Sequence, residues 1–535
     1  MPAPEAMAGE TWLLARRAVV SDGGIVAAQH VDAAEAGAEI LRRGGNAVDA
    51  AVACAFASGA VEPWNSGIGG GGQLVFAEAE GGKVHAVDFL PIAPAGLDPV
   101  RYGLAGEPAA SEFGWPDVVE QRNMRGYEAS CVPGTVDGLG LALERFGQKT
   151  LGEVLEPSIR LLDRGLPIDW YASLMIAASA RDLDRFAASR AMFMRAGQPP
   201  LPPDLGGPSV LPLPALAATY RRLATAGRRD FYEGETADLM ARDLEAGDSP
   251  IHRSDLATYR ASVGEPVACT YKHSRISTAG GMSGGPMLIA ALERLDRSIS
   301  LRPGSDPGAE EYVLYASVLR DLFAERLATF GHAGRSGHTT SIAVADRDGN
   351  LVALTNTVGV SFGAKVVLPA TGIVMNSAVN NFSPVPGGPN PIAPGRYPLL
   401  NICPAICTRD AKPWAAIGAA GGRRIIPAVA QLASFLVDMA MPIERAFATP
   451  RIDVSGSRIV CDARLPAAVR DALARLGPVV PVTQRITSDP FGLPSGVTRD
   501  VASGLNAGMA AIHSSTAAAV AEGPRTKTGA APRRP

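Results

Sequence analysis

The chain has 535 residues, of which 47% are hydrophobic and 19% charged, a balance that is ordinary for globular proteins and sufficient for a large core. Lys and Arg total 50 against 53 Asp and Glu, which gives a net charge of −3. Because no block of the sequence is rich in Lys and Arg, these values argue against binding to nucleic acid or to an anionic membrane surface. The six cysteines are scattered without a CxxC pair, which favours buried free thiols over a disulfide framework or a zinc site.

Targeting and membrane signals are weak in this sequence. The first twenty residues lack the basic start, long apolar run and small-residue cleavage site of a signal peptide. The apolar stretch at residues 425–441 contains Gln431 and Asp438 and is shorter than a bilayer requires. We therefore expect a soluble, cytoplasmic protein without a membrane partner.

The first half of the chain is predicted to alternate strands and helices. Residues 25–30 are predicted as a strand, and residues 33–43 as a helix whose apolar positions share one face. The sequence GGN at 44–46 interrupts this helix, and residues 47–60 form a second helix of small side chains. Further helices are predicted at 139–146, 151–164, 215–226 and 236–245, with a proline-rich break at 199–214.

From Thr339 onward the pattern favours strands. Residues 339–346 and 351–357 are predicted to pair as a hairpin, because the sequence DGN at 348–350 is typical of a tight turn. The remaining expected elements are short strands at 366–368, 373–376 and 414–417, a loop at 387–397, and a helix at 425–441 that begins just after Gly421 and Gly422.

Three short patterns suggest other chemistry. Residues 67–72 (GIGGGG) match a dinucleotide-binding fingerprint, but a strand rather than a helix is expected at 73–77. The glycines more simply allow close approach of one backbone to another. Residues 281–285 (GMSGG) match the serine-hydrolase elbow around Ser283, with a candidate strand before and helix after, but no Asp/His pair lies beside it. The seven histidines show no metal-ligand spacing.

Several motifs, taken in order, resemble those of one known family. Residues 337–341 (GHTTS) and 345–350 (ADRDGN) resemble the processing site of the γ-glutamyltranspeptidases, where a threonine opens a strand. That family's next strand carries a T-x-T element followed by an FG pair, which correspond to 355–357 (TNT) and 362–363 (FG). Other landmarks that resemble the family lie at 44–51, 67–72, 131–135 (CVPGT), 283–285 and 418–422 (GAAGG). The resemblance extends from about Ile25 to Arg451.

The resemblance implies an α/β fold, a four-layer αββα sandwich of the N-terminal nucleophile hydrolase type. It also implies that the precursor cuts itself between His338 and Thr339. Residues 1–338 would then form a large chain and residues 339–535 a small catalytic chain that begins with Thr339. The two chains are expected to remain associated as one intertwined structural domain, with the assembly of pairs into a homo-oligomer left open.

The expected chemistry depends on Thr339. A threonine hydroxyl needs a base, and the freed α-amino group, with a reference pKa of about 7.7–8.0, supplies one in the same residue. By resemblance, Thr357 hydrogen-bonds the nucleophile, and the amides of Gly421 and Gly422 stabilise the oxyanion. No metal and no organic cofactor is implied.

The substrate pocket departs from the family pattern. Leu90 replaces the family's carboxylate-binding arginine, and Asn380 and Asn381 replace its paired aspartates. The family's paired serines, an asparagine and a glutamine correspond to Leu400 and Asn401, Gly359 and Ala378. Arg423 remains as a cation that can meet a carboxylate or lie solvated at the surface. A pocket without ionic partners should lose affinity for a γ-glutamyl zwitterion and favour an apolar or uncharged acyl group.

The sequence therefore predicts an N-terminal-threonine amidohydrolase that acts on a small-molecule amide with non-glutamyl specificity, similar to the cephalosporin-acylase or oxamate-amidohydrolase branches of the family. Two alternatives remain open. One is a genuine γ-glutamyltransferase or glutathione hydrolase with a rebuilt pocket. The other is an uncleaved binding protein that has kept the fold without catalysis.

Overall fold

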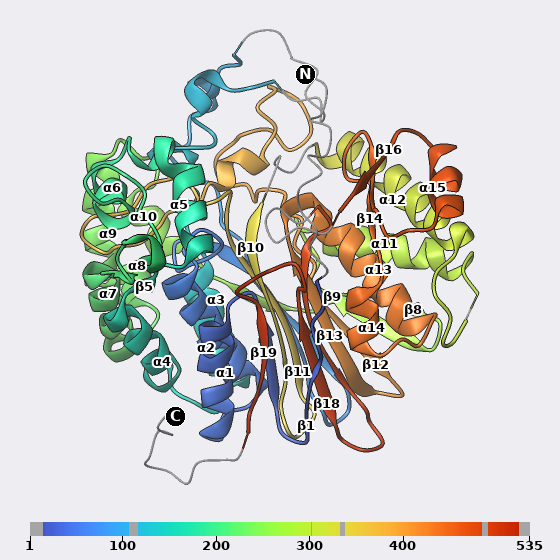
Figure 1. Ribbon diagram of the computed structural model, residues 1–535. Helices are drawn as coiled ribbons and strands as arrows, with labels where there is room; N and C mark the ends of the chain where they lie inside the picture. The colour runs from blue at the N-terminus through green and yellow to red at the C-terminus, as the bar shows by residue number, and fades with distance from the viewer. Residues whose placement is uncertain (1–13, 106–115, 301, 332–336, 484–489, 524–535) are drawn as a thin grey trace.

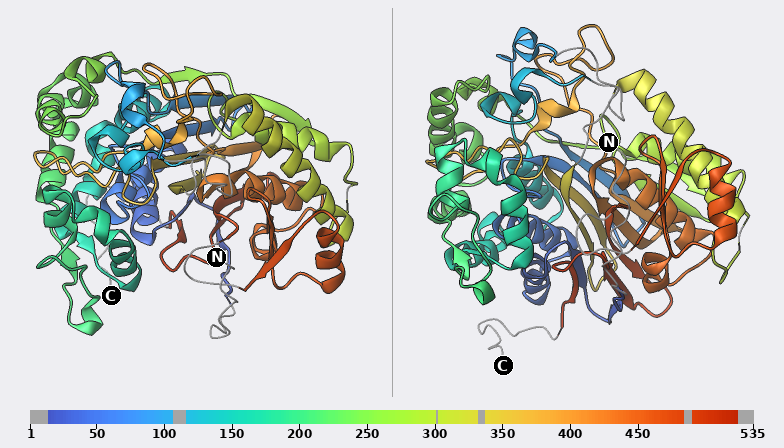
Figure 2. Two further views of the ribbon diagram at one scale, coloured as in Figure 1. Left: turned by 90° about the horizontal axis from the view of Figure 1, so that it is seen from above. Right: turned by 45° about the horizontal axis from the view of Figure 1, so that its top comes forward.

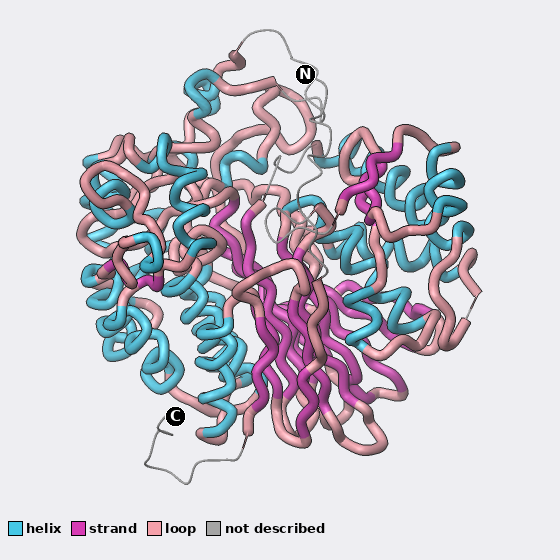
Figure 3. Tube along the Cα trace, viewed as in Figure 1, coloured by secondary structure: helices cyan, strands magenta, loops and turns pink. Residues whose placement is uncertain are grey.

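Two antiparallel sheets lie face to face at the centre of the protein, and helices cover the outer face of each (Figure 1). The computed structural model describes residues 14–105, 116–300, 302–331, 337–483 and 490–523. Figure 3 separates the central strands from the two flanking groups of helices. The described residues thus form four layers in the order helix, sheet, sheet, helix, which is the αββα sandwich expected from the sequence.

Each central sheet has seven strands. The first runs in the order β19 (Ala518–Ala521), β2 (Ile25–Ala28), β10 (His338–Ala345), β11 (Leu351–Gly359), β3 (Gly71–Ala77), β4 (Val84–Phe89) and β7 (Ser262–Gly264). The second runs in the order β1 (Val19–Ser21), β18 (Asn506–Ala510), β17 (Leu493–Arg499), β13 (Lys412–Ala420), β12 (Ala405–Arg409), β9 (Ser274–Thr278) and β8 (Val267–Tyr271). Both sheets therefore combine strands from before and after position 338.

Small side chains fill the space between the two sheets. The buried cluster there includes Ala27, Ala343 and Ala353 from the first sheet and Ala416 from the second. Alanines on facing strands let two sheets pack closely, and both faces of β10 and β11 are consequently buried. The hairpin that begins at His338 thus lies at the centre of the molecule.

The helices form the two outer layers (Figure 2). On the first sheet lie α1 (Val31–Arg42), α2 (Ala47–Val61), α3 (Thr135–Phe146), α4 (Leu151–Arg164), α5 (Trp170–Leu183), α6 (Ala187–Phe193), α7 (Pro214–Ala226), α8 (Asp230–Glu233), α9 (Glu235–Ala246) and α10 (Arg253–Thr258). On the second lie α11 (Gly285–Asp296), α12 (Ala309–Phe330), α13 (Ile425–Val437), α14 (Ile443–Ala448) and α15 (Ala467–Ala474). Smaller sheets join β14 (Ile452–Asp453), β15 (Ile459–Asp462) and β16 (Val479–Val482), and β5 (Leu166–Pro167) with β6 (Val210–Leu211).

Helix α2 is the central buried helix of the first layer. All 15 of its residues are buried, and it packs directly against β10. Its N-terminus is fixed by a capping box in which the Asn46 side chain accepts from the amide of Asp49, and the Asp49 carboxylate accepts from the amide of Asn46. Near its other end, a side chain at Gly59 would lie 3.0 Å from the α-carbon of Gly67. The small residues of α2 are therefore required by close packing.

Several predictions made from the sequence agree with these elements, and two need correction. The hairpin and the helices of the first half lie where expected, within a few residues. Residues 366–368 and 373–376 are not strands, because they form only an isolated bridge between Val367 and Val374. The helix that starts at Ile425 ends at Val437 rather than at 441. Beyond it the chain reverses at Ala440, whose φ of 48° is left-handed.

The serine-hydrolase elbow at Ser283 has the expected neighbours but not the expected exposure. Strand β9 precedes it and α11 follows it. The Ser283 side chain is fully buried, however, and its hydroxyl donates to the carbonyl of Gly280 at 2.9 Å. A nucleophile must be open to its substrate, so Ser283 is a turn residue here.

The described residues contain neither a membrane-spanning helix nor a cluster of metal ligands. No helix in the described ranges has both the length and the apolar character needed to cross a bilayer. Among the same residues, no group of three His, Cys, Asp or Glu side chains is placed to hold a metal ion.

Candidate active site

The hairpin of β10 and β11 brings Thr339 and Thr357 together. The two residues are direct partners in the antiparallel register, with an irregularity between His338 and Thr339. The Thr339 hydroxyl donates to Thr357 Oγ1 at 3.4 Å, and the Thr357 hydroxyl donates to the carbonyl oxygen of His338 at 2.6 Å. The amide of Gly359 donates to Thr357 Oγ1 at 2.9 Å and holds this hydroxyl in place. A continuous chain of hydrogen bonds therefore connects the Thr339 hydroxyl to the carbonyl that precedes it.

The glycine-rich loop at 67–72 packs its backbone against that of β11. A side chain at Gly70 would lie 2.2 Å from the carbonyl oxygen of Thr357, and one at Gly72 would lie 2.0 Å from that of Thr355. The Gly70 carbonyl in turn accepts the amide of Gly134 at 2.8 Å. These contacts support the simple explanation of the loop, that its glycines allow close backbone approach.

The turn at Gly421 and Gly422 lies opposite the hairpin. Both residues have left-handed backbones, with φ of 125° and 64°, and they lead directly into α13. Neither backbone amide has a hydrogen-bond acceptor among the described residues. Gly337 packs against this turn, because a side chain there would lie 2.8 Å from the α-carbon of Gly422. The two amides are thus available close to the peptide before Thr339.

A pocket of about 390 Å³, counting its open mouth, lies between the hairpin and this turn. We name it the Thr339 pocket. Eleven residues line it: Gly337, Thr339, Thr357, Gly359, Asn380, Asn381, Leu400, Asn401, Ile402, Gly422 and Ile425. None of these has a charged side chain. Asn401 Oδ1 is buried and lacks a hydrogen-bond partner among the described residues, so the pocket wall contains an unused polar group.

The sequence-predicted site residues are therefore largely brought together. Gly359, Asn380, Asn381, Leu400 and Asn401 line the same pocket as Thr339, Thr357 and Gly422. Gly359 has a φ of 97°, and Ser377 Oγ would lie 2.5 Å from any side chain at that position.

Four predicted residues lie outside this wall, and one of them, Ala378, belongs to a separate buried apolar cluster. Gly421 is one residue behind it. Leu90 is buried in the same apolar cluster as Leu400, behind the pocket. Arg423 is only 8% exposed, and its guanidinium donates to the carbonyl of Ser455 at 3.3 Å. Arg423 is thus neither a wall residue nor a solvated surface arginine.

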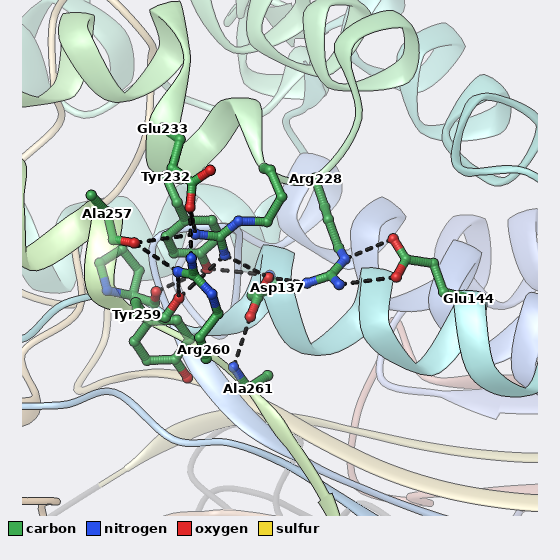
Figure 4. Close-up of polar contacts among 11 residues, drawn as sticks. Asp137, Glu144, Arg228, Tyr232, Glu233, Ala257, Tyr259, Arg260 and Ala261 are labelled. Carbon is green, nitrogen blue, oxygen red and sulfur yellow. Dashed lines mark hydrogen bonds and ion pairs between the residues drawn. The ribbon is translucent and has the colours of Figure 1, made fainter.

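A polar cluster around Asp137, drawn in Figure 4, lies beside the segment that carries Leu90. The Tyr259 hydroxyl donates to the Leu90 carbonyl at 2.9 Å. Asp137, whose side chain is 1% exposed, pairs with Arg228 and also accepts the amide of Ala261 at 2.7 Å. The buried Asp137 carboxylate is paired and hydrogen-bonded, as a buried charge has to be. Its contacts join the chain around Tyr259 to α3.

A second buried network lies beneath the hairpin and was not expected from the sequence. Glu62, at the end of α2, accepts the Thr340 hydroxyl at 2.7 Å and the Asn65 amide at 2.9 Å. Asn65 Oδ1 lies 3.2 Å from Nδ1 of His338. Burial raises the pKa of Glu62 to about 7. The network anchors the residues on both sides of Thr339, and its signal in the sequence is an acid that directly follows a helix of mostly small, apolar residues.

His338 and Lys365 have also shifted pKa values. Burial, with the nearby charges of Lys365 and Arg424, lowers the pKa of His338 to about 4. Burial lowers the pKa of Lys365 to about 8. His338 is therefore neutral at pH 7, while Lys365 remains mostly a cation.

The four αββα layers, with a hydroxyl residue near the start of a central strand, define the class of the N-terminal nucleophile hydrolases. A solved cephalosporin acylase from Bacillus halodurans has this fold, with a TM-score of 0.82 at 24% identity over 97% of this chain and 99% of that one.

Sequence comparisons define the family. The γ-glutamyltranspeptidase family model matches residues 33–333 and 324–520. A glutathione hydrolase proenzyme from Pseudomonas sp. (strain A14) is 30% identical over 481 residues, which cover 80% of this chain and 81% of the relative. An acylase ACY 1 proenzyme from Pseudomonas sp. (strain SE83) is 31% identical over 506 residues, which cover 86% and 88%. The chain belongs to the γ-glutamyltranspeptidase family, a family of amide hydrolases and transpeptidases.

Proposed function

We propose that the chain cleaves itself between His338 and Thr339 and then uses Thr339 as the nucleophile of an amidohydrolase with non-glutamyl specificity. The observation that carries this proposal is the hydrogen-bond chain from the Thr339 hydroxyl through Thr357 to the His338 carbonyl. The names of the two Pseudomonas relatives, both proenzymes, support cleavage.

Self-cleavage can follow this hydrogen-bond chain directly. Thr339 Oγ1 bonds to the carbonyl carbon of His338 and gives its proton to Thr357 Oγ1. Thr357 passes its own proton to the carbonyl oxygen, so no net charge has to develop in a buried site. The C–N bond then breaks as the former carbonyl oxygen gives up its proton, which passes to the Thr339 nitrogen; this re-forms the C=O bond and leaves an ester at Thr339 Oγ1 and a free α-amino group. Water hydrolyses this ester to free the His338 carboxylate and the Thr339 hydroxyl.

Turnover of a substrate repeats the same chemistry with a new base. The freed α-amino group of Thr339, with a reference pKa of about 7.7–8.0, accepts the proton of its own hydroxyl. Thr339 Oγ1 attacks the substrate amide, the amine leaves, and water releases the acyl group from the ester. The unpartnered amides of Gly421 and Gly422 are suitably placed to donate to the oxyanion of each tetrahedral intermediate.

The Thr339 pocket supports a neutral acyl group. A γ-glutamyl group carries both an ammonium and a carboxylate, and none of the eleven pocket residues has a charge to pair with either. Leu400 and Ile402 can make apolar contacts with the acyl group, and Asn401 Oδ1 can accept a hydrogen bond from it. The preferred acyl group is therefore apolar or small, with at most an uncharged hydrogen-bonding group at its far end.

The test begins with intact-mass spectra of the purified protein and of Thr339→Ala and Thr339→Ser variants. Two chains, the second beginning at Thr339, are expected for the unaltered protein, and a single uncut chain is expected for Thr339→Ala. Thr339→Ser keeps a hydroxyl and should still cleave. One uncut chain in every sample would refute the mechanism and favour a binding role.

Specificity is tested with anilides that differ only in the acyl group. Hexanoyl anilide should give a kcat/KM at least tenfold above γ-glutamyl anilide. Glutathione should be turned over poorly. A preference for the γ-glutamyl compounds would instead identify a glutathione hydrolase with a rebuilt pocket.

A further inference from the structure

A second pocket, with an empty volume of about 720 Å³ counting its mouth, lies beside the Thr339 pocket. We name it the Lys365 pocket. The wall residues that matter here are Arg125, Ser179, Asp182, His338, Ser361 and Lys365. None of the chemistry proposed above uses it.

The two pockets share one thin wall. Gly337, Thr339 and Gly359 face the Thr339 pocket, whereas His338 and Val360 face the Lys365 pocket. Successive residues of a strand point to opposite sides, so the consecutive residues His338 and Thr339 face different pockets. The backbone of this segment thus separates the two pockets. Cleavage before Thr339 would remove the covalent link that closes this wall.

The Lys365 pocket has an excess of positive charge. Lys365 is 8% exposed, and its ammonium donates to the carbonyl of Ser361. An ammonium has three donors, and none of the ion pairs among the described residues includes this one. Asp182, the acid in the wall, pairs with Arg125 at 2.7 Å. The charge of Asp182 also acts on Lys365, but this carboxylate is shared with Arg125, so the pocket keeps a net positive charge that favours an anionic ligand.

The backbone that presents Lys365 is strained. Phe362 and Lys365 have left-handed φ values of 54° and 65°, which cost about 1–3 kcal/mol each outside glycine. The Phe362 ring is fully buried, with its centroid 6.0 Å from that of Trp64 and 4.8 Å from that of Phe193. This packing holds the turn that carries Lys365, whose side chain lines the pocket. Strain of this kind persists where a fixed geometry serves a site.

We propose that the Lys365 pocket binds a carboxylate on the amine half of the amide substrate, with Lys365 as its charge partner. The acyl half fills the uncharged Thr339 pocket, so the leaving amine has to extend across the thin wall. This inference rests on the proposed function, because it assigns the bound carboxylate to a substrate of that reaction. The binding of a carboxylate itself is tested without any turnover.

The binding test uses benzoate and its neutral analogue benzamide with the uncut Thr339→Ala protein, measured by calorimetry at pH 7. Benzoate should bind at least tenfold more tightly than benzamide, because a charge-assisted hydrogen bond is about twice as strong as a neutral one. Lys365→Met should weaken benzoate at least tenfold, and Lys365→Arg should retain most of the affinity. Lys412→Met, which removes an exposed lysine of β13, is the control and should change nothing.

The pH dependence provides a second readout of the same site. The charged and titratable groups facing Lys365 are Asp182 on α5, Arg125, and His338 on β10. His338 is already neutral at pH 7, because burial lowers its pKa to about 4. Benzoate affinity should therefore hold up to about pH 7, fall by about half near pH 8, where half of the Lys365 side chains have lost their proton, and fall at least tenfold by pH 9.5.

Turnover identifies the half of the substrate that carries the carboxylate. Hexanoyl anilide is compared with hexanoyl-3-aminobenzoate, which adds a carboxylate on the amine, and with adipoyl anilide, which adds one on the acyl group. We expect a lower KM for the aminobenzoate than for the other two compounds, and in Lys365→Met we expect its KM to rise to that of hexanoyl anilide. A Lys365-dependent gain for adipoyl anilide instead would overturn the assignment to the amine half.

Equal binding of benzoate and benzamide, no binding of benzoate, or an unchanged affinity in Lys365→Met would each overturn the site itself. A protein that binds benzoate as expected but stays uncut and inactive would refute the proposed function and leave the carboxylate site standing.

Discussion

Replacement of Thr357 by valine should slow self-cleavage by a factor of about 10²–10³. Valine keeps the branched shape that the strand requires but removes the hydroxyl. In the uncut chain that hydroxyl donates to the His338 carbonyl oxygen at 2.6 Å and accepts from Thr339 at 3.4 Å. Removing one donor from an oxyanion site costs about 3–4 kcal/mol of barrier, which is the basis of the estimate.

The chain provides a matched control two residues earlier on the same face of β11. Thr355 Oγ1 is buried, and it has no hydrogen-bond partner among the described residues. Thr355→Val therefore removes a buried hydroxyl without touching the hydrogen-bond chain and should leave cleavage within threefold of normal. Thr357→Ser retains a hydroxyl and should cleave within about tenfold.

The assay is cell-free translation of the labelled chain, followed over time by the appearance of the two fragments on a gel. Thermal unfolding of each purified variant checks that the fold is intact, since the Gly359 amide also loses its acceptor in Thr357→Val. The reasoning is refuted if Thr357→Val cleaves within threefold of the unaltered chain, or if Thr355→Val slows cleavage equally.

Three further predictions concern the surroundings of the site. Gly70→Ala should lower the free energy of unfolding by about 1–3 kcal/mol and slow cleavage, because the new carbon would lie 2.2 Å from the Thr357 carbonyl oxygen. The control in thermal unfolding is Gly103→Ala, since no atom lies within 4 Å of a side chain at that position. Burial raises the pKa of Glu62 from 4.5 to about 7, so its protonated form stabilises the fold fully below pH 4.5, and this stabilisation, about 3 kcal/mol, is lost as pH rises through 7. In urea unfolding, the free energy of unfolding of the uncut Thr339→Ala protein should fall as pH rises through this range. Adding Glu62→Gln should abolish the fall, and adding the exposed Glu265→Gln should keep it. The same pH dependence in all three proteins would contradict the pKa shift. Tyr259→Phe leaves the buried Leu90 carbonyl without its donor and should cost about 1–3 kcal/mol in unfolding free energy while cleavage proceeds normally; slowed cleavage would show that this support reaches Thr339.

Much of the site could be located from the sequence because it lies in local motifs. The turn at 348–350 between two β-rich runs sets the hairpin register, and that register alone pairs Thr339 with Thr357. The glycines at 70 and 72 likewise mark backbone contacts that no other residue allows. The elbow pattern at Ser283 failed for the opposite reason, since its local sequence says nothing about burial.

Side-chain neighbours from distant parts of the chain required the tertiary structure. Glu62 and Thr340 are 278 positions apart, and only the packing of α2 beneath β10 joins them. Lys365 lies in a turn and Asp182 in α5, so the charge of the pocket that they line cannot be inferred from the sequence of either segment alone.

The sequence by itself thus located the hairpin and its turn, because periodicity and turn residues are local properties, while the four layers and Thr339 as the proposed nucleophile followed from the resemblance to a known family. Only the tertiary structure decided which side chains line each pocket. It also decided that Leu90 and Arg423 are buried without lining the Thr339 pocket. Burial and charge depend on everything packed around a group, and so they are fixed only when distant segments meet.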